Sequence, residues 1–125
     1  METAKAKTIL VIDDDPEFVA ALSTFLTGHG YHVHKAYDAT VGIQHARKKE
    51  IDLMTLDLGL PAGGGLFVLK SVRKLGKVVD LPIIVSTANV REGIEKEVRS
   101  LGASDFIAKP YDLEILLEKI RTFLP

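Results

Sequence analysis

The chain has 125 residues, of which 46% are hydrophobic and 26% charged, and this length and composition are those of one globular domain. A net charge of −1 argues against direct nucleic-acid or membrane binding, and the lack of cysteine excludes disulfides, thiolate nucleophiles and zinc–thiolate sites. No apolar run approaches the roughly 20 residues that span a bilayer, and the first residues lack the apolar core of a secretory signal. We expect a cytoplasmic location and a flexible segment over residues 1–6.

Strand-like and helix-like patterns alternate five times along the chain. Short apolar runs predict strands over residues 8–12, 31–36, 51–56, 82–87 and 104–109. Apolar residues at helical spacing predict helices over residues 16–28, 39–48, 66–76, 90–101 and 113–124. Asp15 before Pro16 is typical of a helix start, and Asp112 is expected to cap the last helix.

This alternation predicts an α/β fold, in which a doubly wound, five-stranded parallel sheet carries five helices on its two faces. The chain shows no linker, repeat or low-complexity stretch, so we expect a single domain over residues 1–125. In sheets of this kind, ligands and chemistry gather at the carboxyl ends of the strands. The residues that directly follow each strand are therefore the candidates for function.

Charged and polar side chains follow four of the five predicted strands. Asp13 and Asp14 come after the first strand and Asp57 after the third, while Thr87 stands at the end of the fourth and Lys109 at the end of the fifth. If these strands are neighbours, the side chains converge on one pocket. Two carboxylates about 4 Å apart repel by about 4 kcal/mol at an effective dielectric constant near 20, so the pocket needs positive charge. Lys109 supplies one unit, and Mg²⁺, which prefers oxygen ligands, would supply two.

Asp57 is also a candidate nucleophile, because carboxylates form aspartyl-phosphates. A cation, the Lys109 ammonium and the Thr87 hydroxyl would then each take one oxygen of a phosphoryl group. Taken alone, each of these residues is more simply a turn, cap or surface residue. The prediction of a phosphoryl-transfer site depends on their gathering at one edge of the sheet.

Four segments, ILVIDDDPEF, DLMTLDLGLPAGGGL, PIIVSTA and GASDFIAKPY, resemble the receiver domain of two-component response regulators in order and spacing. The resemblance covers essentially the whole chain. It implies a flavodoxin-like, CheY-like fold with the strand order 2-1-3-4-5. It also implies a signalling switch in which Asp57 takes a phosphoryl group from a phosphohistidine of a sensor histidine kinase or a histidine phosphotransfer protein. Such a domain is not an enzyme beyond its own phosphorylation and dephosphorylation.

The resemblance implies a metal site at the predicted pocket. Asp13 and Asp14 look like the acidic pair that holds Mg²⁺, and Asp14 is the expected direct ligand. Asp57 and the backbone carbonyl of Gly59 would complete the site. Mn²⁺ is the expected substitute ion.

The resemblance also implies how the switch is read. Lys109 would pair with the phosphoryl oxygens, and the peptide bond between Lys109 and Pro110 is cis in relatives. Thr87 would form a hydrogen bond with the phosphoryl group, and Phe106 takes the position of the aromatic residue that moves inward with Thr87. The face made by the fourth helix, the fifth strand and the fifth helix would then regulate an effector or a second copy of the chain.

Glycines mark the departures from the family pattern. Gly64 stands where relatives usually carry an acid, and the run of three glycines predicts a loose start of the third helix. Gly93 lies inside the predicted fourth helix, where glycine costs about 1 kcal/mol of helix preference relative to alanine. Gly59 and Asn89 flank the pocket, and we expect them to leave a phosphoryl group weakly shielded from water.

Three other readings compete with a phosphorylated switch. A pseudo-receiver that binds partners without phosphorylation would normally have lost Asp57 or the acidic pair, which are both present. An aspartyl-nucleophile phosphatase of the haloacid-dehalogenase type needs a D-x-D-x-T pattern after its first strand, and DDDPE lacks the threonine. A flavin-binding flavodoxin needs a phosphate loop there, which the acidic residues would repel. The first two remain the alternatives.

Overall fold

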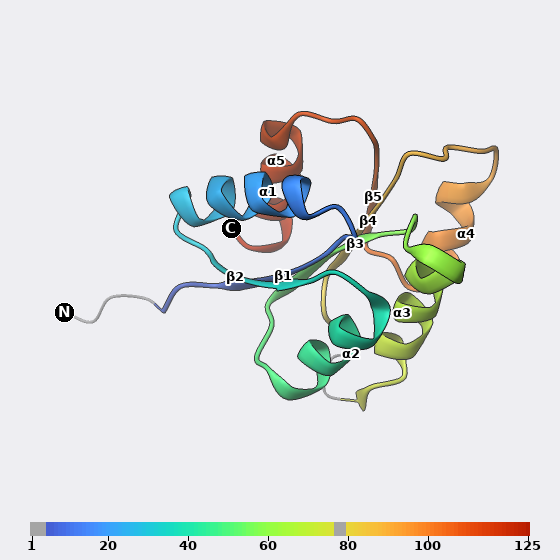
Figure 1. Cartoon of the computed structure of the whole chain (residues 1–125), viewed down its shortest axis with the longest axis horizontal. Coiled ribbons are helices and arrows are strands. Elements are labelled where there is room, and N and C mark those ends of the chain that lie inside the picture. Colours follow the sequence, from blue (N-terminus) through green and yellow to red (C-terminus); the bar gives the residue numbers. More distant parts are fainter. Residues whose placement is uncertain (1–4, 77–79) are drawn as a thin grey trace.

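Five parallel strands form the centre of the computed structural model, which describes residues 5–76 and 80–125 (Figure 1). The strands are β1 (Thr8–Ile12), β2 (His32–Ala36), β3 (Leu53–Asp57), β4 (Ile83–Thr87) and β5 (Asp105–Ala108). Their order in the sheet is β2-β1-β3-β4-β5, and every neighbouring pair is parallel. This confirms the predicted fold class and strand order. The segment expected to be flexible, residues 1–6, lies mostly outside the described residues.

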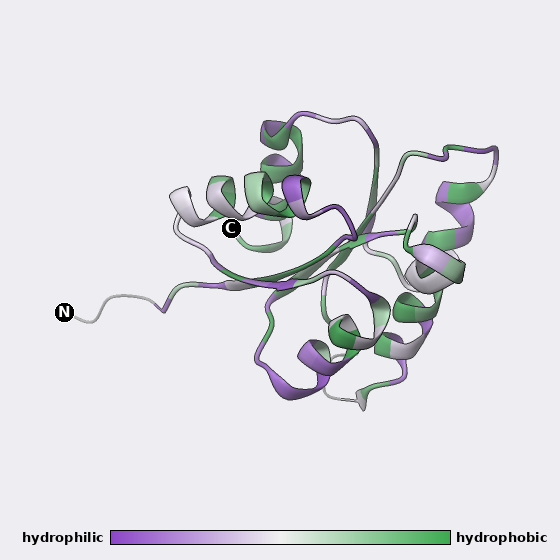
Figure 2. Ribbon diagram, in the orientation of Figure 1, coloured by the Kyte–Doolittle hydropathy of each residue, from purple (hydrophilic) through white to green (hydrophobic). Residues whose placement is uncertain are grey.

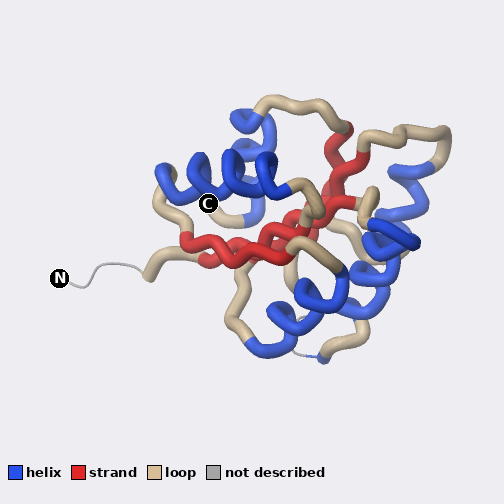
Figure 3. The backbone as a smooth tube through the Cα atoms, viewed as in Figure 1, coloured by secondary structure: helices blue, strands red, loops and turns tan. Residues whose placement is uncertain are grey.

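Within residues 5–76 and 80–125, five α-helices cover the two faces of the sheet. They are α1 (Pro16–Gly28), α2 (Ala39–Lys48), α3 (Gly64–Arg73), α4 (Ile94–Ser100) and α5 (Leu113–Phe123), and a short 3₁₀ turn, η1 (Pro61–Gly63), precedes α3. Helices α1 and α5 lie on one face, and α2, α3 and α4 lie on the other (Figures 1 and 3). None of the helices in the described part of the chain is both long and apolar enough to cross a membrane.

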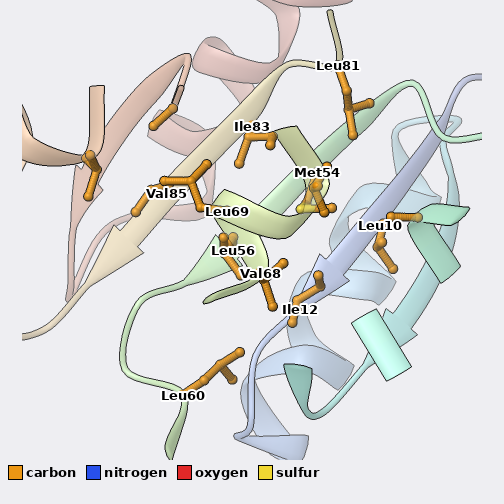
Figure 4. Packing of buried hydrophobic residues seen from close by; sticks show 14 of the residues in the cluster. Leu10, Ile12, Met54, Leu56, Leu60, Val68, Leu69, Leu81, Ile83 and Val85 are labelled. Carbon is orange, nitrogen blue, oxygen red and sulfur yellow. The ribbon is translucent and has the colours of Figure 1, made fainter. Parts of the chain in front are cut away.

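Alternating strand side chains divide the core into two clusters. On one face Leu10, Met54 and Ile83 pack with residues of α2, α3 and α4 (Figure 4). On the other face Val11 and Ile84 pack with residues of α1 and α5. The central strands β1, β3 and β4 are therefore buried on both sides, as expected for a parallel sheet covered by helices, whereas the edge strands β2 and β5 are more exposed. Figure 2 shows the same pattern, because hydrophobic strand residues lie inside and hydrophilic residues face outward from the helices.

Local signals account for the position of α1. The side chain of Asp15 accepts hydrogen bonds from the backbone N–H groups of Glu17 and Phe18, at 3.1 Å and 3.3 Å, and Pro16 is the first helical residue. Asp112 occupies the predicted N-cap position of α5, although among the described residues its side chain makes no capping hydrogen bond. The predicted start of α1 is confirmed, and it places Phe18 beside the pocket at the carboxyl edge.

The prediction for the fourth helix was wrong at its start. Gly93 is the N-cap of α4 rather than an internal residue. Its φ of +84° is a left-handed backbone conformation, which residues other than glycine rarely adopt and which does not occur inside an α-helix. Val90 therefore lies outside the helix, and 57% of its surface is exposed. The third helix also ends earlier than predicted, at Arg73.

Two of the three glycines, Gly64 and Gly65, form the closely packed first turn of α3, which differs from the loose helix start that we expected. Gly63 has a φ of +72° and precedes the helix, whereas Gly64 and Gly65 are buried. A Cβ atom on Gly65 would lie 2.5 Å from the Cα of Leu58 and 2.6 Å from the carbonyl oxygen of Asp57. A side chain at position 65 has no room, and the helix begins in direct contact with the end of β3.

Candidate functional site

The carboxyl edge of the sheet brings together the side chains predicted to form a pocket. Asp57 is the last residue of β3 and Thr87 the last of β4, while Asp13 follows β1 and Lys109 follows β5. Because β1, β3, β4 and β5 are consecutive in the sheet, their carboxyl ends lie side by side (Figure 1). Asp13, Asp57 and Thr87 are buried, with exposed fractions of 3%, 7% and 4%. Buried charges at a strand end require partners.

Lys109 is the positive partner of two of these acids. Its ammonium lies 2.7 Å from Oδ2 of Asp13 and 3.6 Å from Oδ2 of Asp57. Burial alone lowers the pKa of Lys109, but the hydrogen bond to Asp13 and the charge of Asp57 outweigh burial and raise that pKa. Lys109 therefore stays protonated and bridges the acids of β1 and β3. The peptide bond between Lys109 and Pro110 is cis.

Asp57 is held from its own loop. Its Oδ1 accepts a hydrogen bond of 2.8 Å from the backbone N–H of Gly59. Burial raises the pKa of the Asp57 carboxyl, and the charges of Asp13 and Asp14 add to the rise, while the Gly59 N–H and Lys109 oppose it. One lysine does not balance three carboxylates, so the pocket favours additional positive charge.

Three carboxylates in the described part of the chain are arranged as a cation site. One oxygen each of Asp13, Asp14 and Asp57 lie within 4.8 Å of one another, and Asp14 is the exposed member of the group. An all-oxygen donor set with one side open to water is the kind that Mg²⁺ and Mn²⁺ accept. The donor chemistry and the excess of negative charge therefore fit the predicted ion.

Thr87 and Phe106 lie on neighbouring strands, β4 and β5. The hydroxyl oxygen of Thr87 accepts a hydrogen bond of 3.0 Å from the backbone N–H of Asn89, which holds the start of the following loop. Phe106 pairs with Val85 in the sheet and is partly buried against the cluster beneath α4. The same ring lines a surface groove with Val90, which precedes α4.

An aromatic pair that the sequence did not predict lies beside Lys109. The ammonium of Lys109 lies 4.8 Å above the ring centre of Phe18, and the rings of Phe18 and Tyr111 meet edge to face at 5.9 Å. Burial raises the pKa of the Tyr111 hydroxyl, and the charges of Asp13 and Asp57 add to the rise. The sequence pattern marked Phe18 only as an apolar residue of the first helix. Its contact with Lys109 joins residues far apart in the sequence and was therefore not predictable from local spacing.

A second group that the sequence analysis missed ties α4, β5 and α5 together. Arg99 of α4 donates a hydrogen bond of 2.8 Å to Oδ1 of Asp105, and Lys119 of α5 donates one of 3.2 Å to Oδ2. Burial alone raises the pKa of Asp105, but hydrogen bonds from the Phe106 N–H, Lys119 and Arg99 outweigh burial and lower that pKa. Asp105 is therefore a charged junction of three elements.

Comparison with known proteins identifies similar domains. The family model for the response regulator receiver domain matches residues 9–121. The transcriptional regulatory protein DltR of Streptococcus agalactiae is 36% identical over 113 residues, which are 90% of this chain and 50% of that protein. The chain thus spans about half the length of the curated relatives it matches.

Solved structures give the same likeness. A putative response regulator from Chloroflexus aurantiacus is 30% identical, with a TM-score of 0.88 over 96% of this chain and 98% of that one. A CheY-like receiver domain protein from Methanospirillum hungatei is 28% identical, with a TM-score of 0.87 over 94% and 93% of the two chains. The similarity extends over nearly the whole fold that positions the pocket.

Proposed function

Because the chain belongs to the response regulator receiver domain family, we propose that it is a signalling switch in which Asp57 is the phosphoacceptor. The observation that carries this proposal is the convergence on Asp57 of a lysine ammonium at 3.6 Å and of the oxygens of two further acids. A buried carboxylate with these neighbours has what phosphoryl transfer needs, a nucleophile beside groups that neutralise phosphoryl oxygens.

The proposed metal ligands are the carboxylates of Asp13, Asp14 and Asp57 and the backbone carbonyl of Gly59, around Mg²⁺ or Mn²⁺. A divalent cation supplies two positive charges against the oxygens of the transferred group. Asp13 has a second role, because its Oδ2 bonds to Lys109 at 2.7 Å and so keeps the ammonium at the edge of the pocket. The exposed Asp14 is the acid that an ion entering from water meets first.

The proposed reaction is an in-line transfer. A carboxylate oxygen of Asp57 forms a bond to the phosphorus, the bond between the phosphorus and the donor's histidine nitrogen breaks, and the electron pair stays on the imidazole. The ammonium group of Lys109 shifts from Asp57 to pair with one phosphoryl oxygen, and the Thr87 hydroxyl donates a hydrogen bond to another. A carboxylate nucleophile has no proton to lose when it attacks, so the proposed reaction needs no general base.

The proposed output follows from the new phosphoryl oxygens. They add negative charge and acceptors, and they favour the arrangement in which Thr87 is drawn in and Phe106 is buried. The face of α4, β5 and α5 then differs between the two states and is read by an effector or a second copy. The phosphodonor is a sensor histidine kinase or a histidine phosphotransfer protein, the proposed location is cytoplasmic, and residues 1–125 act as one receiver unit.

Incubation with Mg²⁺ and acetyl phosphate, followed by intact-mass measurement, tests this proposal. We expect an added mass of about 80 Da, one phosphoryl group, that chelation of Mg²⁺ prevents. Asp57→Asn removes the adduct, whereas Asp112→Asn, which neutralises an exposed acid at the start of α5, keeps it. A folded wild-type chain with no adduct refutes the proposal and favours a pseudo-receiver. Steady release of phosphate from a phosphomonoester would favour a phosphatase.

A further inference from the structure

Helix α3 begins against the backbone of the phosphoacceptor. A Cβ atom on Gly65 would lie 2.6 Å from the carbonyl oxygen of Asp57 and 2.5 Å from the Cα of Leu58, so only hydrogen separates the helix from the end of β3. The contact involves backbone on both sides, and neither side can yield by changing a rotamer. A displacement of the Asp57 backbone therefore moves the first turn of α3.

The helix itself is a firm element. Val68, Leu69 and Val72 are fully buried in the cluster between the sheet and helices α2, α3 and α4 (Figure 4). Close-packed interiors have low compressibility and transmit displacements. A shift at one end of this 10-residue helix is therefore carried to its other end.

Helix α3 ends on the turn between α4 and β5. Its last residue, Arg73, donates two hydrogen bonds to the carbonyl oxygen of Gly102, from Nε at 2.9 Å and from an Nη atom at 2.7 Å. Gly102 has a φ of +108°, and a Cβ atom on it would lie 2.8 Å from Cγ of Arg73. The left-handed conformation of Gly102 and its lack of a side chain thus leave room for the side chain of Arg73.

The turn that Arg73 holds leads into the output face. Arg99 donates a hydrogen bond of 3.1 Å to the carbonyl oxygen of Ser104 and one of 2.8 Å to the side chain of Asp105, which also accepts a hydrogen bond from Lys119 of α5. Helices α3 and α4 lie on the same face of the sheet (Figure 1). Asp57 is the last residue of β3, whereas this turn directly precedes β5, so the two lie at opposite edges of the parallel sheet. Hydrogen bonds therefore run from the last residue of α3 through one turn to α4, β5 and α5.

We propose that α3 is a second link from the phosphoacceptor to the α4–β5 turn, separate from Thr87 and Phe106, and that Arg73 is its positioning residue. This inference rests on the proposed function of Asp57. A movement at the end of β3 displaces Gly65 through their close contact, and the whole helix moves with it. The two hydrogen bonds from the Arg73 guanidinium then displace Gly102. A rigid element that contacts both sites is the kind of structure through which such coupling travels.

Hydrogen exchange with and without beryllium fluoride and Mg²⁺, a mimic of the phosphorylated state, tests this link. In the wild type we expect beryllium fluoride to change the exchange rates of the amides of residues 102–105 at least about fivefold. In Arg73→Gln that change falls below about twofold, while beryllium fluoride still binds at Asp57 within about threefold of wild-type affinity. Lys70→Gln, which changes an exposed cation on the same helix, keeps the wild-type response.

The outcomes separate the two proposals. An undiminished response of residues 102–105 in Arg73→Gln overturns the link through α3 and leaves the phosphoacceptor proposal intact. A wild-type chain that binds no beryllium fluoride overturns the proposed function itself. If Arg73→Gln does not fold, Arg73→Lys decides, because lysine keeps the charge but lacks the two-nitrogen fork. In that variant we expect the response to fall to about half or less, and a full response overturns the link.

Discussion

Gly65→Ala is expected to destabilise the protein, although alanine is the better helix former. A Cβ atom at position 65 would lie 2.5 Å, 2.6 Å and 2.9 Å from three backbone atoms of Asp57 and Leu58. Carbon atoms in good contact are about 3.5–4.0 Å apart, so the new methyl would be close to 1 Å too near. The clash is with backbone, and α3 or the loop after Asp57 must move to relieve it.

Two opposing effects set the size of the change. Replacing glycine by alanine gains up to about 1 kcal/mol of helix preference, whereas overpacking a closed site costs about 1–3 kcal/mol or more. The upper end of the cost applies, because no flexible side chain can yield, and the net loss in free energy of unfolding is about 2 kcal/mol. With an m-value of about 2 kcal/mol/M, the urea midpoint falls by about 1 M.

The neighbouring residue provides a matched control. A Cβ atom on Gly64 would lie 3.2 Å from Cβ of Leu60 and 3.4 Å from Cβ of Ala39, and both are side-chain atoms. Crowding and helix preference then nearly cancel, so Gly64→Ala is expected within about 0.5 kcal/mol of wild type. Urea unfolding followed by circular dichroism measures all three proteins. A Gly65→Ala midpoint at or above that of the wild type would refute the packing argument.

Three further predictions concern charge and the pocket. Burial, followed by the charge of a nearby lysine, lowers the pKa of His34 and His45 below 6.5 in the folded protein. Unfolding therefore takes up protons below about pH 6.5, so stability is full above that pH and declines below it, and an unchanged urea midpoint at about pH 5.5 contradicts this. Mg²⁺ at 100 times its dissociation constant adds about 2.7 kcal/mol of stability in thermal melts, Asp14→Asn reduces the gain, and equal gains would count against Asp14 as a ligand. Phe18→Leu loses the contact with Lys109 and about 1–2 kcal/mol in urea unfolding, and no loss would show that the contact contributes nothing.

Local patterns in the sequence were sufficient for the fold class, and the strand order that gathers the site residues was implied by the resemblance to receiver domains. Apolar runs and helical spacing identify strands and helices, and a parallel sheet brings the residues after its strands to one edge. Asp13, Asp57 and Lys109 meet for this reason. The roles of these residues in phosphoryl transfer remain predictions that the mass measurement tests.

Contacts between distant residues were not predictable in this way. Arg73 and Gly102 are 29 residues apart, and neither lies in a pattern that marks it as part of a pair. Gly93 fits a helical spacing equally well inside or before α4, and only its φ of +84° decides. Glycine in a sequence says that a side chain is missing, whereas the reason for its absence depends on what occupies the neighbouring space.

Gly59 and Gly65 show how that reason determines the behaviour of Asp57. A Cβ atom on the exposed Gly59 would lie 3.2 Å from Oδ1 of Asp57, so glycine leaves this side of the carboxylate uncovered. A Cβ atom on Gly65 would lie 2.6 Å from the backbone carbonyl oxygen of Asp57, so glycine allows α3 to pack directly against the backbone of that residue. A phosphoryl group on Asp57 would thus be open to water at the front, while the backbone behind it rests on a helix. Gly59→Ala is therefore expected to lengthen the life of the phosphorylated state, and Gly65→Ala to disturb how α3 follows it.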